Sequence, residues 1–531
     1  MVWLFVLVCS GGMATWPSQI RASTVAVAGC DSTAIGAAID QSRSGDTVYL
    51  PAGRYSVSQT IRPKSNTVLK GAGPGQTVVV CALSEPGSIL SLAGRENVEV
   101  SDLTLDGNGD AKALQGISAG NARKLNLHHL VIRHLVKGGG FGPHGILFSG
   151  ENPTGRGSVT DSRIADCVLE SIGLGAEFGC GIRFSWGSSR NQVLRTAIRD
   201  TGRGGIFADN GSTDVLIQSN TVSGSGGEGL GIEVWGGCDR AVIEDNRIDH
   251  WLSFGGCDYG AARRNVVSDK SGAYKFCGIE AIGSYLVITD NVVDGGQKIG
   301  LSVSGSQPKR YCFWARNTIR GCNQWGAQLQ GESGGMAYHY FHQCRFLSTP
   351  VGLGPVWYPG DEGHGFRVNG DVCHVTLEEC ESSGNGRLGL QLGGSRVDAL
   401  CFRRCTIRDN RGAAVRGPQG YTALEWTDCS VEGNGDDRLP PAKAFSHPAP
   451  EAVFELRREI RCGEPVEPIG RCRVAHGQIA ALLWDFGEGV PSKELRPRHL
   501  YDRPGRYRIT LIAWDEAGRA GRATKEIEVK R

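Results

Sequence analysis

The sequence has little net charge, few methionines and no long apolar run. Fifty-seven basic and 55 acidic side chains give a formal net charge of +2 over 531 residues, and no basic tract disturbs this balance. The electrostatic signature of a nucleic-acid-binding protein is therefore absent. The apolar run from Val2 to Cys9 is too short to cross a bilayer, and no other segment could do so. We expect no nucleic acid partner and no membrane span.

The same N-terminal run is typical of an export signal. It is followed by the small residues Ala26-Val27-Ala28, which resemble a signal-peptidase site, although no basic residues precede the run. We predict a signal peptide over residues 1–28 and a secreted or cell-surface protein.

Cysteine is frequent, but its spacing does not indicate a metal site. None of the 18 cysteines forms a Cys-x-x-Cys pair, so a structural zinc ion is not expected. In an exported protein, Cys462 and Cys472 could bridge, and Cys238, Cys257 and Cys277 could either pair or remain free thiols.

A short motif of the form Gly-Ile-x-Val recurs through most of the chain, often 22 to 29 residues apart. Each copy alternates apolar and polar residues, as does a strand with one buried face. A strand repeat of this period indicates a solenoid of β-coils. The copies start at Gly145, Gly181, Gly205, Gly231, Gly278, Gly300, Gly326, Gly365, Gly389 and Gly412.

A second marker occupies one slot in each repeat. It is asparagine in the central coils and cysteine in later ones, which predicts a column of stacked small side chains inside a turn. We interpret this column as structural and the cysteines in it as buried thiols. Its members are Asn220, Asn246, Asn265, Asn291, Asn317, Cys344, Cys380, Cys405 and Cys429, with Cys167 earlier in the chain.

The N-terminal part predicts a cap on this solenoid. An amphipathic helix is expected over residues 34–42, followed by strand-like segments at 45–55 and 68–73. Together with the repeats, this pattern resembles the right-handed parallel β-helix of the pectate lyase superfamily. The resemblance implies an all-β, single-stranded parallel β-helix over residues 29–435. It does not select an activity, because lyases, hydrolases, epimerases and adhesins share this scaffold.

The C-terminal part has a different composition. Residues 436–450 are rich in proline and predict a semi-rigid linker. Beyond it, Trp484-Asp485-Phe486-Gly487, His499-Leu500-Tyr501 and Pro504-Gly505-Arg506-Tyr507 resemble the motifs of a PKD domain. The resemblance implies an immunoglobulin-like β-sandwich over residues 451–531. Such modules are usually spacers or weak polysaccharide binders, so no catalysis is expected there.

The outer face of the β-helix is the expected site of chemistry. In each Gly-Ile-x-Val unit the Ile and Val should point inward, which sends x and the residue after Val to water. Stacked coils then form an exposed strip that suits an extended sugar chain. The candidate catalytic residues are Arg183, Asp209, Glu233, Asp258, Lys275, Glu280 and His364, and the candidate substrate-binding residues are Trp235, Lys298, Gln328 and Arg367.

Strand spacing suggests alternative reactions for these acids. Glu233 and Asp258, on adjacent coils, should lie about 5 Å apart, which suits a retaining hydrolase, whereas Asp209 and Glu233 should lie nearer ~8 Å, which suits an inverting one. A lyase or epimerase would instead use the acids to hold Ca²⁺ against a uronate carboxylate, with Arg183, Lys275 or Lys298 as proton acceptor or charge neutraliser. The plain alternative is a solvated sheet face with no chemistry.

Known active-site motifs match only in part. Gly363-His364-Gly365 is similar to the histidine motif of polygalacturonases, but the paired aspartates are missing. Gly142-Pro143-His144 resembles the Asp-Pro-His motif of mannuronan epimerases, with Gly142 in place of the acid. The arginine motif of pectate lyases is absent. We therefore predict a monomeric, secreted polysaccharide-active enzyme, either a lyase or a glycoside hydrolase acting on an extended acidic glycan. The alternative is a non-catalytic carbohydrate-binding or adhesive surface protein.

Overall fold

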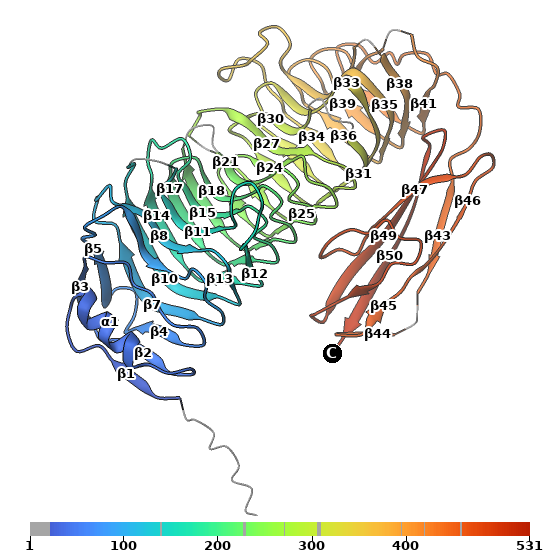
Figure 1. The fold of residues 1–531 in the computed structure, drawn as a ribbon. Helices are drawn as coiled ribbons and strands as arrows, with labels where there is room; N and C mark the ends of the chain where they lie inside the picture. Colours follow the sequence, from blue (N-terminus) through green and yellow to red (C-terminus); the bar gives the residue numbers. More distant parts are fainter. Residues whose placement is uncertain are drawn as a thin grey trace, which may run out of the picture.

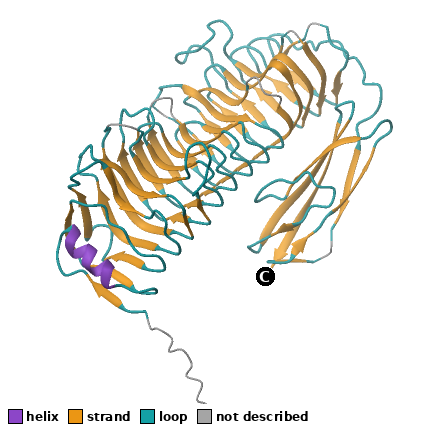
Figure 2. Ribbon diagram, in the orientation of Figure 1, coloured by secondary structure: helices purple, strands orange, loops and turns teal. Residues whose placement is uncertain are grey.

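The computed structural model describes residues 22–138, 141–226, 230–269, 271–304, 309–394, 396–418, 420–456 and 459–531. A long stack of coils runs through most of these residues, and a separate sandwich lies along its C-terminal half (Figure 1). Strands dominate both parts, and the only helix of the described residues lies at the N-terminal end of the stack (Figure 2). The predicted all-β architecture is confirmed.

The helix α1 (Ser32–Gln41) caps the first coil, close to the predicted range. Asp31 begins it by accepting a hydrogen bond from the backbone N–H of Ala34 at 2.8 Å. Its buried residues Ile35, Ala38 and Ile39 cover the open end of the apolar interior, which would otherwise face water. The cap therefore has the role that the sequence predicts.

Each coil contributes to three parallel ladders, which we number first, second and third. The first ladder contains the Gly-Ile-x-Val units. Its strands are β6 (Gly87–Ser91), β8 (Ala113–Ala119), β11 (His144–Ser149), β15 (Cys180–Ser185), β18 (Gly204–Asp209), β21 (Leu230–Trp235), β24 (Leu252–Gly255), β27 (Lys275–Ile282), β30 (Gln297–Val303), the first parts of β33 (Trp325–His342) and β35 (His364–Glu378), β37 (Leu390–Leu392) and β40 (Val415–Arg416).

The second ladder follows the turn after these strands. It contains β1 (Thr24–Ala26), β2 (Thr47–Leu50), β4 (Val68–Gly71), the first parts of β7 (Glu99–Asp106) and β10 (Asn126–Leu135), β13 (Arg163–Ala165), β16 (Gln192–Leu194), β19 (Leu216–Gln218), β22 (Val242–Glu244), β25 (Ala261–Arg263), β28 (Val287–Thr289), β31 (Lys309–Ala315), the later parts of β33 and β35, β38 (Arg396–Arg403) and β41 (Leu424–Thr427).

The third ladder closes each coil. It contains β3 (Gly53–Val57), β5 (Thr77–Cys81), the later parts of β7 and β10, β14 (Val168–Ile172), β17 (Ala197–Thr201), β20 (Thr221–Ser225), β23 (Arg247–Ile248), β26 (Val266–Val267), β29 (Val292–Asp294), β32 (Thr318–Arg320), β34 (Arg345–Leu347), β36 (Glu381–Ser383), β39 (Thr406–Arg408) and β42 (Ser430–Glu432); the short pair β9 (Ala122–Arg123) and β12 (Val159–Thr160) lies apart.

The interior of the coils is one continuous apolar core. Ile232 and Val234 are fully buried in it, so the predicted inward direction of these side chains is confirmed. The asparagine column is also present: the side chain of Asn220 donates to that of Asn246 at 3.0 Å, and Asn246 donates to Asn265 at 2.9 Å. These amides satisfy one another and neighbouring backbone carbonyls, which fixes the register of the coils.

The C-terminal sandwich packs against the second ladder. Its strands are β43 (Glu451–Glu455), β44 (Ile460–Arg461), β45 (Pro465–Val466), β46 (Ile469–Arg473), β47 (Ile479–Asp485), β48 (His499–Leu500), β49 (Gly505–Asp515) and β50 (Ala520–Lys530). A shared apolar cluster joins the two parts, with Phe313 and Tyr340 of the β-helix against Ile512 and Trp514 of the sandwich. The sandwich is thus docked on the β-helix and not merely tethered to it.

Some sequence predictions concern the N-terminus and the cysteines. Residues 1–21 of the predicted export signal lie outside the described residues, while Thr24–Ala26 form β1 and pair with β2. Cleavage after Ala28 would remove that strand.

Cys462 and Cys472 are free, so the bridge considered for the sandwich is not formed. Among the described helices, none has the length and apolar character required to span a membrane.

Candidate functional site

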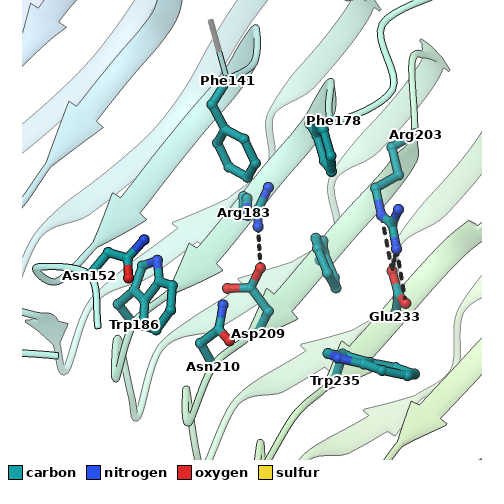
Figure 3. A pocket seen from close by; sticks show the side chains of 11 residues that line it. Phe141, Asn152, Phe178, Arg183, Trp186, Arg203, Asp209, Asn210, Glu233 and Trp235 are labelled. Carbon is teal, nitrogen blue, oxygen red and sulfur yellow. Dashed lines mark hydrogen bonds and ion pairs between the residues drawn. The ribbon is translucent and has the colours of Figure 1, made fainter. Parts of the chain in front are cut away.

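An open pocket of about 690 Å³ lies on the first ladder, over β15, β18 and β21 (Figure 3). Arg183, Asp209 and Glu233 form its floor together with Phe207, which lies in register between Arg183 and Glu233, and further aromatic rings form its walls. The floor side chains belong to alternate positions of the strands, because the intervening residues fill the core. The pocket brings together three predicted catalytic residues, Arg183, Asp209 and Glu233, and the predicted substrate-binding residue Trp235.

Arg183 and Asp209 form a buried ion pair on the pocket floor. The guanidinium donates to the Oδ2 atom of Asp209, and Ser185 donates to Oδ1. The Arg183 guanidinium also lies 4.3 Å from the ring of Phe141 and 4.8 Å from that of Phe207. Its Nε and Nη1 atoms are buried without a partner among the described residues. These donors lack an acceptor, which is costly inside a protein.

Glu233 forms the second ion pair of the pocket. The guanidinium of Arg203, which precedes β18, donates to its Oε2 atom at 3.0 Å, as the dashed lines in Figure 3 show. Burial nevertheless raises the pKa of the Glu233 carboxyl, with the nearby Asp209 charge acting in the same direction and Arg203 opposing it. Glu233 therefore holds a proton to higher pH than an ordinary glutamate.

Aromatic side chains make the pocket suitable for a sugar ring. Phe141 and Phe178 stack on each other at 4.9 Å between ring centroids, and both are partly exposed. Trp235, at the end of β21, is 50% exposed and faces the pocket from another side. Exposed apolar faces beside charged groups are the arrangement that binds pyranose rings.

The prediction that the strip faces water is wrong for most of its members. Arg183, Asp209, Glu233 and Glu280 each expose 6% or less of their surface. They point away from the core as predicted, but loops and ion-pair partners cover them. The sequence did not indicate this cover, because loop placement depends on contacts between distant residues.

Asp258 does not lie beside Glu233. The residue in register with Glu233 on the next coil is Ser253, and Asp258 comes after the turn that follows β24. There its Oδ1 atom accepts a hydrogen bond from the backbone N–H of Ser284 at 2.7 Å. The expected separation of about 5 Å, and the retaining hydrolase that it suggested, are therefore not supported.

Other predicted residues lie further along the first ladder. Glu280 is two coils from Glu233 and accepts a hydrogen bond from Ser253 at 2.8 Å; burial raises its pKa. Gln328 donates to Ser302 at 3.0 Å. Lys298 lies 5.0 Å from the ring of Trp357, and Lys275 begins β27. None of these side chains lines the pocket around Glu233.

His364 and Arg367 belong to a separate cluster around Asp361. The Nε2 atom of His364 lies 3.2 Å from the Asp361 carboxylate, and the backbone N–H of Leu388 donates to Nδ1 at 3.3 Å. Arg367 lies 3.4 Å from the same carboxylate and 4.2 Å from the ring of Trp325. Both ring nitrogens of His364 are thus engaged. This cluster is about 24 Å from Glu233, because five coils separate them.

The sequence interpretation missed Arg203, Phe141 and Phe178. Arg203 lies just before a Gly-Ile-x-Val unit, and the candidates Lys275 and Lys298 lie shortly before the corresponding units of later coils. This signal could have identified it. Phe141 and Phe178 lie in loops, where no periodicity specifies which side chain reaches the ladder.

No candidate calcium site is evident in the described part of the chain. There, no group of three or more His, Cys, Asp or Glu side chains has an arrangement that could hold a metal ion. In the pocket, Asp209 and Glu233 each face an arginine instead. Calcium binding remains a prediction without a defined site.

Family comparisons agree with this architecture. A model of the right-handed β-helix region matches residues 180–338 and 277–439, and a pectate lyase-like model of rhamnogalacturonase A and epimerases matches residues 28–230. A PKD domain model matches residues 447–530. The chain is a right-handed parallel β-helix protein of the pectate lyase-like superfamily with a C-terminal PKD domain.

Individual relatives cover only parts of the chain. Mannuronan C5-epimerase AlgE1 of Azotobacter vinelandii is 34% identical over 227 residues, which are 38% of this chain and 15% of the epimerase. The pre-neck appendage protein of Bacillus phage B103 is 34% identical over 149 residues, 24% of this chain and 17% of that protein. The A-module structure of A. vinelandii mannuronan C-5 epimerase AlgE6 has 16% identity and a TM-score of 0.37, covering 77% of this chain and 95% of the module.

Proposed function

We propose that this protein is a polysaccharide-active enzyme that cleaves an acidic glycan in the pocket over β15, β18 and β21. The proposal rests on one observation: two carboxyl groups lie in the same aromatic-lined pocket but in different environments. Glu233 has a raised pKa and can serve as the proton donor. Asp209, in the same pocket, accepts hydrogen bonds from Arg183 and Ser185.

The relative position of the two acids suits an inverting hydrolase. Phe207 is in register with Glu233, and Asp209 follows Phe207 by two residues on the same face. One coil spacing combined with two residues along a strand gives about 8 Å between the two positions. A separation of this size leaves room for a water molecule. In this proposal Glu233 protonates the glycosidic oxygen, and Asp209 takes a proton from the attacking water.

The charge of the pocket favours an acidic glycan. With Glu233 protonated, the positive charges of Arg183 and Arg203 exceed the single negative charge of Asp209. The unpartnered nitrogens of Arg183 would gain an acceptor if a uronate carboxylate displaced the covering Phe141 ring. The similarity to a mannuronan C5-epimerase points to the same class of substrate.

Lyase or epimerase chemistry is the second candidate, and the 34% identity to that epimerase favours it. It ranks second because Gly142 occupies the position of the acid in the Asp-Pro-His motif that residues 142–144 resemble. In that case Arg183 and Arg203 would neutralise the uronate carboxylate while a base removes the adjacent proton.

The test is a comparison of three purified proteins on polyuronates and neutral polysaccharides. The wild type should release new reducing ends from an acidic polymer, and Glu233→Gln should lower kcat by about 10²-fold or more. Glu96→Gln is the matched control, since it also removes a glutamate that pairs with an arginine. Unsaturated, ultraviolet-absorbing products or changed uronate stereochemistry would instead support the second candidate. Binding without turnover would support the non-catalytic alternative, and full activity of Glu233→Gln would refute the proposed site.

A further inference from the structure

The pocket over β15, β18 and β21 has two chemically different ends. Its positive charges lie toward the beginning and middle of these strands, because Arg203 precedes β18 and Arg183 is inside β15. The other end, where the strands finish, is lined mostly by uncharged side chains (Figure 3). These are Asn152, Trp186, Asn210 and Trp235. One pocket therefore joins a positively charged end to a polar, uncharged one.

The uncharged end offers hydrogen-bonding groups that the protein does not use itself. Within the described ranges, the side-chain amides of Asn152 and Asn210 and the indole N–H of Trp186 make no hydrogen bond. Amide groups both donate and accept, as sugar hydroxyls do, and indole faces stack on sugar rings. The chemistry of this end therefore suits the hydroxyl groups and the ring of a sugar.

The one charge at this end disfavours a second carboxylate. Of the described lining residues there, only Asp209 is charged, and it is in register with Trp235 on the next coil. A uronate that stacked on Trp235 would bring its carboxylate near Asp209, and like charges at an interface repel. The arginine end avoids this repulsion, because β18 (Gly204–Asp209) spans about 17 Å between Arg203 and Asp209. A uronate thus fits the arginine end, and an uncharged sugar fits the tryptophan end.

A glycine determines where the Trp235 ring lies. Gly255, on β24, is the in-register neighbour of Trp235. A Cβ atom at position 255 would overlap with the Cε3 and Cζ3 atoms of the indole, so the ring occupies the space beside this glycine. Gly255 is not among the residues with positive φ, and its backbone accepts an ordinary side chain. Alanine at this position would therefore fit the strand but displace the Trp235 ring.

We propose that the end of the pocket lined by Asn152, Trp186, Asn210 and Trp235 is a subsite for an uncharged sugar residue, next to a uronate residue at the arginine end. The glycan chain then crosses the first ladder along its strands, and the preferred glycan has a uronate linked to an uncharged sugar. Gly255 is a positioning residue that acts through Trp235. The subsite deepens the proposed function and rests on it, because the uronate must occupy the pocket around Glu233.

The first test varies the charge of a polymer without changing its linkages. Alginate and polygalacturonate are compared with their half and fully carboxyl-reduced forms, in which uronates become uncharged hexoses. In at least one series, the half-reduced form should bind the wild type roughly fivefold more tightly than the unreduced form, because the sugar at Trp235 no longer repels Asp209. The fully reduced form should bind most weakly, since the arginines then have no carboxylate to bind.

The second test separates the positioning of Trp235 from a general effect on the fold. Gly255→Ala and Trp235→Ala should each weaken binding of the half-reduced polymer about tenfold, and Trp235→Ala/Gly255→Ala should bind no more weakly than Trp235→Ala. Gly255→Ala should keep the wild-type midpoint of urea denaturation. Gly393→Ala is the matched control and should keep full affinity, because Gly393 directly follows β37 of the same ladder, lacks a positive φ and faces open space.

The possible results distinguish the subsite from the reaction. Affinity that only falls as carboxylates are removed, absence of binding in both series, or unchanged affinity of Trp235→Ala would overturn the subsite. Unchanged affinity of Gly255→Ala, or a loss that adds to that of Trp235→Ala, would overturn the role of Gly255. Turnover is measured separately: cleavage of an acidic glycan without preference for the half-reduced form refutes the subsite alone, and that preference without cleavage refutes the reaction alone.

Discussion

Removal of one buried arginine should loosen the contact between the PKD domain and the β-helix. Arg263, at the end of β25, is 1% exposed and bridges the two parts. It lies 2.9 Å from the Glu244 carboxylate on the β-helix, 2.8 Å from the Asp485 carboxylate on the PKD domain, and donates to the carbonyl of Gly489 at 2.6 Å. Arg263→Met keeps much of the side-chain volume but leaves both carboxylates buried without this partner.

The expected cost is large because the partners are buried on both sides. Loss of one member of a buried ion pair typically destabilises by about 3–5 kcal/mol. Chemical denaturation would measure this change, and limited proteolysis between residues 436 and 450 would detect an undocked domain. Arg190→Met is the control, since Arg190 and Asp161 form an exposed pair with 55% and 42% side-chain exposure. It should change the free energy of unfolding by less than ~1 kcal/mol.

A small effect would refute this account of the contact. If Arg263→Met changed stability no more than Arg190→Met, and proteolysis were also unchanged, the buried bridge would not hold the domains together. The variant Arg263→Met/Asp485→Asn also removes the carboxylate that loses its ion-pair partner, whereas Glu244 keeps Arg264 at 3.0 Å. It should recover more than half of the loss, because the penalty arises mainly from the isolated buried carboxylate of Asp485.

Three further predictions concern the pocket and the coil interior. Turnover should fall as pH rises through the raised pKa of Glu233, because the proton donor is then lost; a pH–rate profile checks this. The same raised pKa means that this group stabilises the native state at low pH and loses that contribution as pH rises through the folded value. Trp235→Ala should raise KM about tenfold with little change in the free energy of unfolding, because Trp235 is half exposed. Asn246→Ala should cost about 2–4 kcal/mol in urea denaturation, since it leaves Asn220 and the carbonyl of Ile217 without their hydrogen-bond partners.

The β-helix could be predicted because local and global signals coincide in it. The Gly-Ile-x-Val alternation specifies which side chains enter the core, and Ile232 and Val234 occupy it as expected. The asparagine column indicates how the coils stack, because identical residues at the same position of successive repeats are expected to be neighbours in space. Asn220, Asn246 and Asn265 are such neighbours. In a solenoid each coil contacts mainly its neighbours, so the repeat pattern in the sequence is sufficient to predict most of the fold.

The candidate site could be predicted only in part, because it depends on coil length and on loops. The direction of Glu233 follows from alternation, but its ion pair with Arg203 joins residues 30 positions apart. The short coil after Trp235 placed Ser253 at the position for which Asp258 was predicted. The turn of this short coil has no apolar pattern from which the register of its residues with Glu233 could be predicted. Phe141 and Phe178 reach the pocket from loops, which follow no period.

The docked PKD domain also narrows the surfaces on which a glycan can bind. Tyr259, Tyr285, Tyr311 and Tyr338 stack in sequence along the β-helix and, taken alone, would suit sugar rings. The PKD domain packs against this tyrosine stack: the ring of Trp514 lies 5.5 Å from that of Tyr311, and the Lys493 ammonium lies 5.0 Å from the ring of Tyr259. Among the described residues, the apolar part of this contact lies on the second ladder and not on the first. The partly exposed rings of Phe141, Phe178 and Trp235 line the pocket over the first ladder, so a sugar residue in the proposed site would not meet the PKD domain.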